Sequence, residues 1–506
     1  MAAHSSGDSI GGDNDISAQP HEFNDMVRSG TICIISDSDL ESDPDDVVVI
    51  TDSPEIGSTR NMDEILRRTA VRRGRATTTA LPFPNGVIRL THMLGEKENL
   101  ADAMTLTDIL QPAKLRKALL STFVLDLDWL LPHFVPATKL VIVKSYDPAV
   151  EHRGVYQSED GRVTLVNPEF AAKQMYPIMH SKVMLLFYDD YVRFVASSAN
   201  LYREDWTRLQ NIVFIQDMPF TPSAVQDHTE FGDTLAASLR DISVPEAVVA
   251  QLQFVDFSRI KAYIVTSVPT AAGRSKFHAK SYGLDRLSQV ARMIHDPELD
   301  KKEAYDTTFY CYGSSMGKLN SSYLLNFYAS ALGTTPSTIR LKGGISPSEA
   351  EANVKVGFHT RAQGQDNIHG AAPQYCIKFQ SNYYLDPAFP KQALCKIESR
   401  VANTLVHAKV ILARSNATKQ GRQRAQEHGW MYLGSHNFTP GAWGHKRAQG
   451  QPCHVNNYEF GVVLPNVHYE SMFGRDTVTW NGSRVPLPFR LAWTEYEQNE
   501  LPLLDT

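Results

Sequence analysis

Short apolar runs rich in β-branched residues recur along the chain from about residue 81 onward. Leu140–Val143 and Val163–Val166 are two examples, and each is bounded by polar or charged residues. Runs of this length and composition predict buried strands. Helical stretches are expected between such runs, for example around Leu110–Leu120. Because strands and helices alternate in this way, we predict an α/β fold with mixed sheets flanked by helices.

The chain has 506 residues, which is too long for one ordinary core and suggests two folded domains of roughly 200 residues each. We expect residues 1–78 to form a disordered acidic tail that ends in a basic linker. Residues 79–245 and 246–506 are expected to form two related domains with pseudo-two-fold symmetry and a single shared active site.

The tail contains two short β-branched runs beside acids and serines, Ile32–Ile35 and Val47–Ile50. Such a run can add as a strand to the edge of a partner's sheet, and both runs resemble SUMO-interacting motifs. Chance apolar runs in a polar tail are the alternative interpretation. The basic cluster Arg67–Arg75 indicates a nuclear-import signal or a nucleic-acid contact, or else a solvated linker. We therefore expect a nuclear protein, with SUMO or SUMO-modified proteins among its partners.

Charge is distributed unevenly along the chain. Residues 1–60 hold 13 acidic and two basic residues, which leaves 48 basic and 43 acidic residues in the rest. A mildly basic body is compatible with a polyanionic ligand. The chain has no apolar run long enough to span a membrane and no secretory signal, so we expect no membrane association. The five cysteines are scattered without a Cys-x-x-Cys pair, which indicates neither a disulfide framework nor a zinc site.

The strongest pattern in the sequence is a motif that occurs twice. In its first copy, His180 and Lys182 precede the apolar run Val183–Phe187, and Asn200 lies 20 residues after the histidine. Trp206 follows six residues after that asparagine.

The second copy repeats this order in the other half of the chain. His407 and Lys409 precede Val410–Leu412, and Asn437 is again followed six residues later by a tryptophan, Trp443. The histidine and the asparagine are 30 residues apart here, because a polar and basic segment is inserted between them. One His-x-Lys pair carries no information, but two copies in register indicate a duplicated unit.

The motif suits chemistry on a phosphodiester. Residues i and i+2 of an extended strand point to the same face, so each histidine projects together with its lysine. If the halves pack about a two-fold axis, both pairs converge on one cleft. Two ammonium groups and two carboxamides can bind the phosphate oxygens, a task that a metal performs elsewhere. One histidine can attack phosphorus, and the other can protonate the leaving oxygen.

Each imidazole needs a partner that fixes its tautomer. Glu459 lies 22 residues after Asn437, at the start of an apolar run. Gln210 and Asn211 occupy the corresponding region after Asn200. These three residues are candidates for orienting the two histidines. No cluster with metal-ligand spacing accompanies them, so we expect neither a metal nor a cofactor.

The two motifs resemble those of the phospholipase D superfamily, and within it the chain resembles the tyrosyl-DNA phosphodiesterase family. The superfamily pattern has Asp five residues after each lysine, whereas Phe187 and Arg414 stand at those positions here. Absence of this Asp is typical of the tyrosyl-DNA branch and argues against the phospholipases. The likeness extends over about residues 80–500 and includes the segments Asp126–Trp129 and Tyr458–Gly461.

The resemblance implies a monomeric DNA-repair phosphodiesterase. Its substrates would be single-stranded or nicked DNA with a topoisomerase I peptide, or another adduct such as phosphoglycolate, on the 3′ end. His180 would be the nucleophile that forms a phosphohistidine, and His407 the general acid and base. Another superfamily nuclease or phospholipase, or a non-catalytic scaffold that binds DNA ends, remains as an alternative.

The resemblance also implies roles for the residues around the two histidines. Glu459 would support His180, and Gln210 would support His407. The remaining predicted site residues would contact the phosphate or the DNA: Lys182, Lys409, Asn200, Asn437, Ser314, Ser315 and Ser435.

Overall fold

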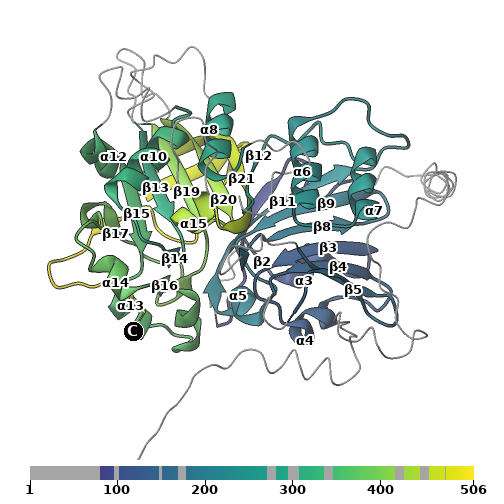
Figure 1. Cartoon of the computed structure of the whole chain (residues 1–506), viewed down its shortest axis with the longest axis horizontal. Coiled ribbons are helices and arrows are strands. Elements are labelled where there is room, and N and C mark those ends of the chain that lie inside the picture. The colour runs from purple at the N-terminus through teal and green to yellow at the C-terminus, as the bar shows by residue number, and fades with distance from the viewer. Residues whose placement is uncertain are drawn as a thin grey trace, which may run out of the picture.

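The computed structural model describes residues 80–95, 102–146, 151–168, 178–269, 281–294, 307–334, 346–415, 427–444, 455–472 and 475–505. The predicted SUMO-interacting runs, Ile32–Ile35 and Val47–Ile50, and the basic cluster Arg67–Arg75 lie outside these residues. The described residues form two lobes that lie side by side, one from each half of the chain (Figure 1).

A mixed sheet forms the centre of the first lobe. The parallel pairs β3–β4 and β4–β6 lie beside antiparallel strands, among them the pairs β8–β9 and β9–β11. In spatial order its strands are β2 (Ala103–Met104), β1 (Val87–Thr91), β11 (Ile212–Pro219), β9 (Tyr191–Ser197), β8 (Val183–Phe187), β3 (Lys117–Thr122), β4 (Lys139–Lys144), β6 (Val163–Asn167) and β5 (Gly154–Gln157).

A second mixed sheet forms the centre of the other lobe. In spatial order its strands are β23 (Ser483–Arg484), β22 (Arg475–Trp480), β21 (Asn457–Met472), β20 (Glu427–Gly434), β19 (Val410–Ser415), β13 (Thr307–Tyr312), β15 (Val354–Phe358), β17 (Leu394–Lys396) and β24 (Thr494–Glu495). Strand β12 (Tyr263–Ser267) pairs with β21 in the antiparallel sense.

The two sheets repeat one strand order. The series β11-β9-β8-β3-β4-β6 corresponds to the series β21-β20-β19-β13-β15-β17, with matching parallel and antiparallel neighbours. Strand β1 pairs with β11 as β12 pairs with β21. The predicted fold of two related α/β units with mixed sheets is therefore confirmed. The predicted domain boundary at 245/246 falls between helix α6 (Glu230–Asp241) and helix α7 (Glu246–Val249).

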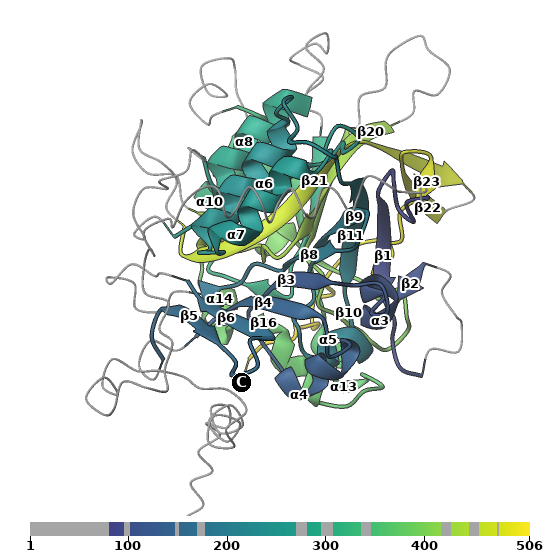
Figure 2. The ribbon, with the colours of Figure 1, turned by 90° about the vertical axis from the view of Figure 1, so that its right-hand side faces the viewer.

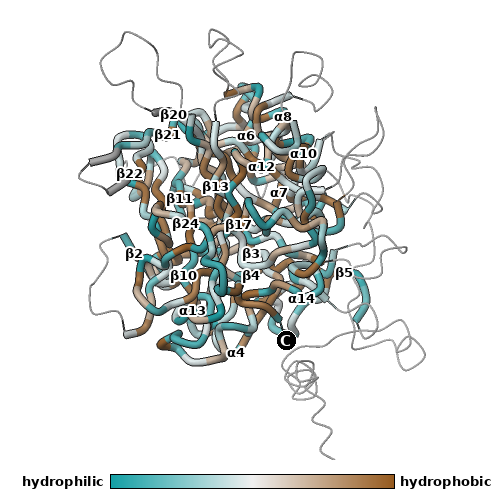
Figure 3. The backbone as a smooth tube through the Cα atoms, turned by 90° about the vertical axis from the view of Figure 1, so that its left-hand side faces the viewer, coloured by the Kyte–Doolittle hydropathy of each residue, from teal (hydrophilic) through white to brown (hydrophobic). Residues whose placement is uncertain are grey.

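One hydrophobic core joins the two lobes. It contains residues from the facing sides of both sheets, such as Phe194 of β9 and Phe460 of β21, whose ring centroids are 6.0 Å apart. Separate cores lie on the outer face of each sheet. Figure 3 shows the hydrophobic segments concentrated along the inner strands. Because the largest core is shared, burial of apolar area fixes the two halves against one another.

Helices cover the outer faces and the junction between the sheets. Helices α6 and α8 (Gly283–Ile294) both contact β12, and α8 also packs along α10 (Ser321–Ala331) (Figure 2). The other α-helices with described bounds are α3 (Leu106–Leu110), α4 (Leu127–Leu130), α5 (Arg203–Thr207), α12 (Pro347–Asn353), α13 (Arg361–Gln365), α14 (Ser381–Tyr384) and α15 (Pro440–Trp443). None of the helices in the described part of the chain has the length and apolarity needed to cross a membrane.

Two short parallel bridges connect the halves at the motif histidines. Strand β7 (Ile178–Met179) of the first half pairs with β21, and β18 (Leu405–Val406) of the second half pairs with β10 (Leu209–Gln210) of the first. Each bridge ends one residue before a motif histidine. Each histidine is therefore placed by backbone from the opposite half.

The helix predicted around Leu110–Leu120 is wrong. Helix α3 ends at Leu110, and β3 begins at Lys117. Residues Ala118–Leu120 are buried between β4 and β8 at the centre of the sheet. A short apolar run is compatible with a buried strand or a buried helix, and neighbouring strands decide the outcome here.

Candidate active site

His180 lies directly after the first bridge. Its backbone N–H donates to the carbonyl of Tyr458, at 2.9 Å. Its Nδ1 lies 2.8 Å from Oε2 of Glu459. An ionised carboxylate accepts the Nδ1 proton, so the lone pair of the neutral ring is on Nε2. His180 is almost fully buried, and its ring lies 5.4 Å from that of Phe123.

Glu459 is held as a carboxylate by several groups. Ser435 donates to Oε2 at 2.5 Å, and the carboxamide of Asn457 donates to Oε1 at 3.0 Å. Burial alone raises the pKa of Glu459, but the charges and the hydrogen bond of the surrounding His180, His436 and Lys182 outweigh it and lower that pKa to about 2. The carboxylate therefore stays ionised in the range where an enzyme of neutral pH works.

His407 lies directly after the second bridge, in a position equivalent to that of His180. Its backbone N–H donates to the carbonyl of Gln210, at 2.9 Å. Its Nδ1 lies 3.2 Å from Oδ1 of Asn211 and 3.3 Å from Oδ1 of Asp205. Burial lowers the pKa of His407 to about 4; Asp205 opposes this shift, and Lys409 adds to it. Burial thus favours the neutral ring at pH 7.

The contacts behind the two histidines correspond closely. Ser198 donates to Asn211 at 2.8 Å and accepts the N–H of Ile212 at 3.0 Å. Ser435 donates to Glu459 and accepts the N–H of Phe460 at 2.9 Å. Asn211 is therefore the structural counterpart of Glu459.

Both motif lysines are buried beside their histidines. Lys182 donates to the carbonyl of His180 at 2.8 Å, and Lys409 donates to that of His407 at 2.5 Å. Nζ of Lys409 also lies 3.0 Å from Nε2 of His407. Burial lowers the pKa of Lys182 to about 8 and, with help from Lys182, lowers that of Lys409 well below its usual range. The two ammonium groups thus act on each other, as expected if both motifs face one cleft.

The two asparagines are fixed by the turns that follow β3 and β13. Oδ1 of Asn200 accepts the backbone N–H groups of Phe123 and Val124, at 3.3 and 3.2 Å. Oδ1 of Asn437 accepts the N–H of Ser315 at 3.0 Å and the hydroxyl of Ser314 at 3.2 Å. Because both oxygens are occupied, only amide N–H groups remain to face a phosphate, and the carboxamide of Asn200 donates one of its two to Oδ2 of Asp205 at 2.8 Å.

The turn after β13 requires a glycine. A Cβ on Gly313 would lie 2.7 Å from the backbone nitrogen of Phe438 and 3.2 Å from Cα of Asn437. Only a residue without a side chain allows this close approach to the asparagine. In the other copy Trp206 donates its Nε1–H to the carbonyl of Asn200 at 2.7 Å, which ties this tryptophan to the motif asparagine.

Three predicted roles need correction. Gln210 contacts His407 only through its backbone, because neighbouring strand residues point to opposite sides; both polar atoms of its side chain are buried without a hydrogen-bond partner among the described residues. Asn211 and Asp205 make the predicted contact instead. Ser435 does not face a substrate, since its hydroxyl is engaged by Glu459 and Phe460. Ser314 is likewise fully buried and supports Asn437, whereas Ser315 is only half-buried.

Two residues that the sequence did not single out, Tyr312 and His359, hold the backbone of the residue before His407. The hydroxyl of Tyr312 donates to the carbonyl of Val406 at 2.6 Å. The N–H of Val406 donates to Nε2 of His359 at 3.0 Å. Burial lowers the pKa of His359 to about 4, so its ring is neutral and can accept this bond. His359 directly follows strand β15 (Val354–Phe358), and no repeated motif marks it in the sequence.

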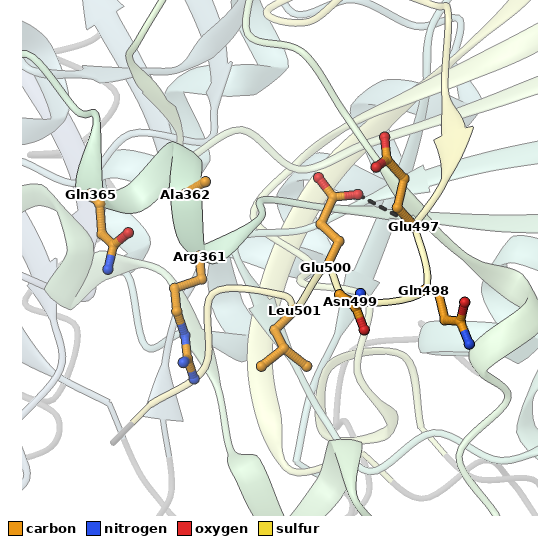
Figure 4. Close-up of a pocket in the computed structure, with 8 residues that line it drawn as sticks. All are labelled: Arg361, Ala362, Gln365, Glu497, Gln498, Asn499, Glu500 and Leu501. Carbon is orange, nitrogen blue, oxygen red and sulfur yellow. Dashed lines mark hydrogen bonds between the residues drawn. The ribbon is translucent and has the colours of Figure 1, made fainter.

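A surface hollow elsewhere has the wrong chemistry for a phosphodiester. It lies between the start of α13 and the C-terminal segment 497–501 and carries the carboxylates of Glu497 and Glu500 (Figure 4). Lys396 pairs with both carboxylates. None of the predicted site residues lines it. Among the described residues, no group of His, Cys, Asp and Glu is arranged to hold a metal ion.

Comparison with known proteins gives a consistent result. The family described as tyrosyl-DNA phosphodiesterase matches residues 87–497. The chain is similar to tyrosyl-DNA phosphodiesterase 1 of Drosophila melanogaster, with 24% identity over 432 residues that cover 79% of this chain and 70% of that protein. The corresponding protein of Arabidopsis thaliana is 20% identical over 451 residues, 76% of this chain and 68% of the relative. The crystal structure of the yeast tyrosyl-DNA phosphodiesterase has the same fold, with a TM-score of 0.60 and 17% identity over 83% of this chain and 100% of the yeast chain.

Proposed function

We propose, from the premise that this chain belongs to the tyrosyl-DNA phosphodiesterase family of the phospholipase D superfamily, that it hydrolyses the bond between a DNA 3′ phosphate and a tyrosine of a trapped topoisomerase I peptide. It is a phosphodiesterase, and its family and fold support a role in DNA repair. We propose in addition that the bond lies at a DNA 3′ end, that the adduct is a protein fragment, and that the reaction passes through a covalent intermediate. Other 3′ adducts such as phosphoglycolate are proposed substrates of the same site.

The difference between the two Nε2 atoms supports the assignment of the nucleophile. Nδ1 of His180 is engaged by Glu459, and its Nε2 makes no hydrogen bond with the described residues. Nε2 of His407 is instead contacted by Lys409, at 3.0 Å. The lone pair on Nε2 of His180 is thus available for attack on phosphorus, and His407 is left to exchange protons.

The reaction then proceeds in two steps. Nε2 of His180 forms a bond to phosphorus while the bond to the tyrosyl oxygen breaks, and protonated His407 gives its Nε2 proton to that oxygen. In the second step neutral His407 takes a proton from water, the hydroxide oxygen bonds to phosphorus, and the bond to His180 breaks. The Nδ1 proton stays directed at Glu459 throughout, and Lys182, Lys409, Asn200 and Asn437 bind the phosphate oxygens.

Substitution of the two histidines tests the proposal. His180→Ala is expected to lower turnover of an oligonucleotide with a 3′-phosphotyrosine by at least about 10⁴-fold, because no nucleophile remains. His407→Ala is expected to leave a covalent enzyme–DNA species, visible on a denaturing gel and absent when His180 is also replaced. Turnover of phosphatidylcholine with no cleavage of the oligonucleotide would contradict the proposal.

We also propose a nuclear location and SUMO binding on the evidence of the tail alone. The support is the basic cluster Arg67–Arg75 and the runs Ile32–Ile35 and Val47–Ile50. Fluorescent fusions with and without residues 1–78, and titration of a peptide of residues 28–56 with SUMO, test these two points.

A further inference from the structure

Asp205 is a fully buried carboxylate at the junction of the two motifs. It lies on α5, five residues after Asn200. Its Oδ2 accepts both the backbone N–H and the side-chain amide of Asn200, at 2.6 and 2.8 Å. Its Oδ1 lies 3.3 Å from Nδ1 of His407, which belongs to the other half of the chain. One carboxylate thus touches a phosphate-binding residue of the first motif and the histidine of the second.

The duplication does not account for this residue. The position five residues after Asn437 is Ala442, which has no polar side chain. His180 receives a carboxylate from strand β21, as Glu459, whereas the counterpart on the other side is the neutral Asn211. The negative charge beside His407 therefore comes from helix α5. A buried carboxylate without a basic partner of its own is costly, so its retention beside an imidazole calls for a role.

We propose that Asp205 is a positioning residue for the general acid: its negative charge, 3.3 Å from Nδ1 of His407, stabilises the imidazolium that must form before the leaving oxygen can be protonated, while Asn211 accepts the Nδ1 proton. This inference rests on the proposed function. In the first step the Nε2 proton of His407 passes to the tyrosyl oxygen, and Asp205 stays ionised before and after. In the second step the proton returns from water to Nε2, and the same carboxylate stabilises the cation again.

The charges around His407 support this role. Lys409 faces Nε2, and Lys182 from the first motif also acts on the ring; both lower the pKa of His407, as does its burial. Cys376, near Asp205 and Lys409, stays a neutral thiol because burial raises its pKa to about 12. Asn211 is uncharged. The negative charge of Asp205 raises the pKa of His407 and so opposes the two lysines and the burial.

Leaving groups of different acidity separate this role from a merely structural one. The first substrate is an oligonucleotide with a 3′-phosphotyrosine, whose phenol needs protonation to leave. The second is the same oligonucleotide with a 3′-(4-nitrophenyl) phosphate, whose leaving group is stable as an anion. Single-turnover rates are measured for both substrates with wild-type protein, Asp205→Asn, Asp205→Glu and Glu459→Gln. The ratio of the two rates within one variant does not depend on how much of the protein is folded.

Asp205→Asn keeps the shape and an acceptor for Asn200 but removes the charge. We expect it to slow cleavage of the tyrosyl substrate by about 10- to 100-fold, a part of what general acid catalysis contributes, and to change cleavage of the nitrophenyl substrate by less than about threefold. The basic limb of the pH profile for the tyrosyl substrate should move to lower pH. With the nitrophenyl substrate in excess over the enzyme, this variant should show a burst of nitrophenol, because breakdown of the covalent species is also slowed. Asp205→Glu retains the charge and should keep the wild-type ratio.

The control variant acts on the other histidine. Glu459→Gln weakens the nucleophile and should slow both substrates alike, leaving their ratio unchanged. An unchanged ratio in Asp205→Asn would overturn the inference and reduce Asp205 to a support of Asn200. Failure of the wild-type protein to form a covalent species at His180 would instead overturn the proposed function, so the two failures are distinguishable.

Discussion

His180 and His407 occupy equivalent places in two copies of one strand arrangement, yet the groups around them differ. Each follows a short parallel bridge to the other half, and each directs Nδ1 at a residue supported by a serine. On the His180 side that residue is the carboxylate of Glu459, and Nε2 makes no hydrogen bond with the described residues. On the His407 side it is the neutral Asn211, with the carboxylate of Asp205 beside it and Lys409 at Nε2. The two halves thus share one strand arrangement, and the two histidines differ through the few residues that contact their ring nitrogens.

The largest effect in this comparison is expected when the carboxylate of the His180 side is neutralised. Glu459→Gln keeps the size of the side chain but no longer enforces the Nδ1–H tautomer. We expect formation of the covalent species to fall by about 10³- to 10⁴-fold, as when the carboxylate that orients a catalytic histidine is replaced by an amide. Rapid-quench measurement of the covalent species tests this. Asn457→Ala removes only the bond to the other oxygen of Glu459 and is the control; a loss of less than tenfold in Glu459→Gln would contradict the role.

The turns that hold the two asparagines allow a second test. Gly313→Ala places a Cβ against the backbone of Asn437 and Phe438, so the carboxamide must shift. We expect kcat/KM to fall by about 10- to 100-fold, because a displacement of roughly 1 Å in a positioning group can cost that much. Gly441→Ala lies near the same turn, but its Cβ would meet no atom closer than 3.9 Å. Steady-state kinetics of the two variants should differ; equal values would show that the turn is not critical.

The pH dependence of the two lysines should differ as well. Burial lowers the pKa of Lys182 to about 8 and lowers that of Lys409 well below its usual range. The ammonium form of Lys182 is lost as pH rises through its pKa, so this group should add a decline of kcat/KM above about pH 8, by up to tenfold per pH unit. Lys182→Arg keeps its charge and should remove this decline, while the separate limb set by deprotonation of His407 remains. A decline above pH 8 that persists unchanged in Lys182→Arg would assign it to another group.

The smallest effect concerns stability, at a position where the halves carry different residues. His436 of the second half is buried between Tyr432 and Ser267, whereas the first half has Ala199 before its asparagine. Burial lowers the pKa of His436 to about 4. The unfolded chain therefore binds a proton below about pH 6.5 that the folded chain does not, and this histidine lowers stability by roughly 1.4 kcal/mol per pH unit between 6.5 and 4.

Urea unfolding at pH 7 and pH 5 measures this contribution. His436→Gln should show a smaller loss of stability on acidification than the wild-type protein. His359 has a similarly low pKa and stays in place in both proteins, so it cancels from the difference. Equal pH dependence in the two proteins would show that His436 does not titrate as expected.

Much of the fold and the centre of the site could be predicted from the sequence because the motif is duplicated. The run Val183–Phe187 is strand β8 with the predicted bounds, and both His-x-Lys pairs lie in the site. The prediction for Gln210 failed because side chains of neighbouring strand residues point to opposite sides. An error of one residue therefore selected Gln210, which points away, in place of Asn211, which contacts His407. Asp205 and His359 were missed because their partners are distant in sequence and belong to other strands. Such pairings depend on the packed halves and leave no local pattern.

The reciprocal bridges have a consequence for incomplete chains. Strand β7 needs β21, and β18 needs β10, so each histidine is placed by residues that the other half supplies. A fragment that ends after the first half would carry a complete His180 motif but lack Tyr458 and Glu459 to orient it. The crossed connections make both histidine sites conditional on the two halves folding together, so a truncated or partly folded chain is expected to be inactive.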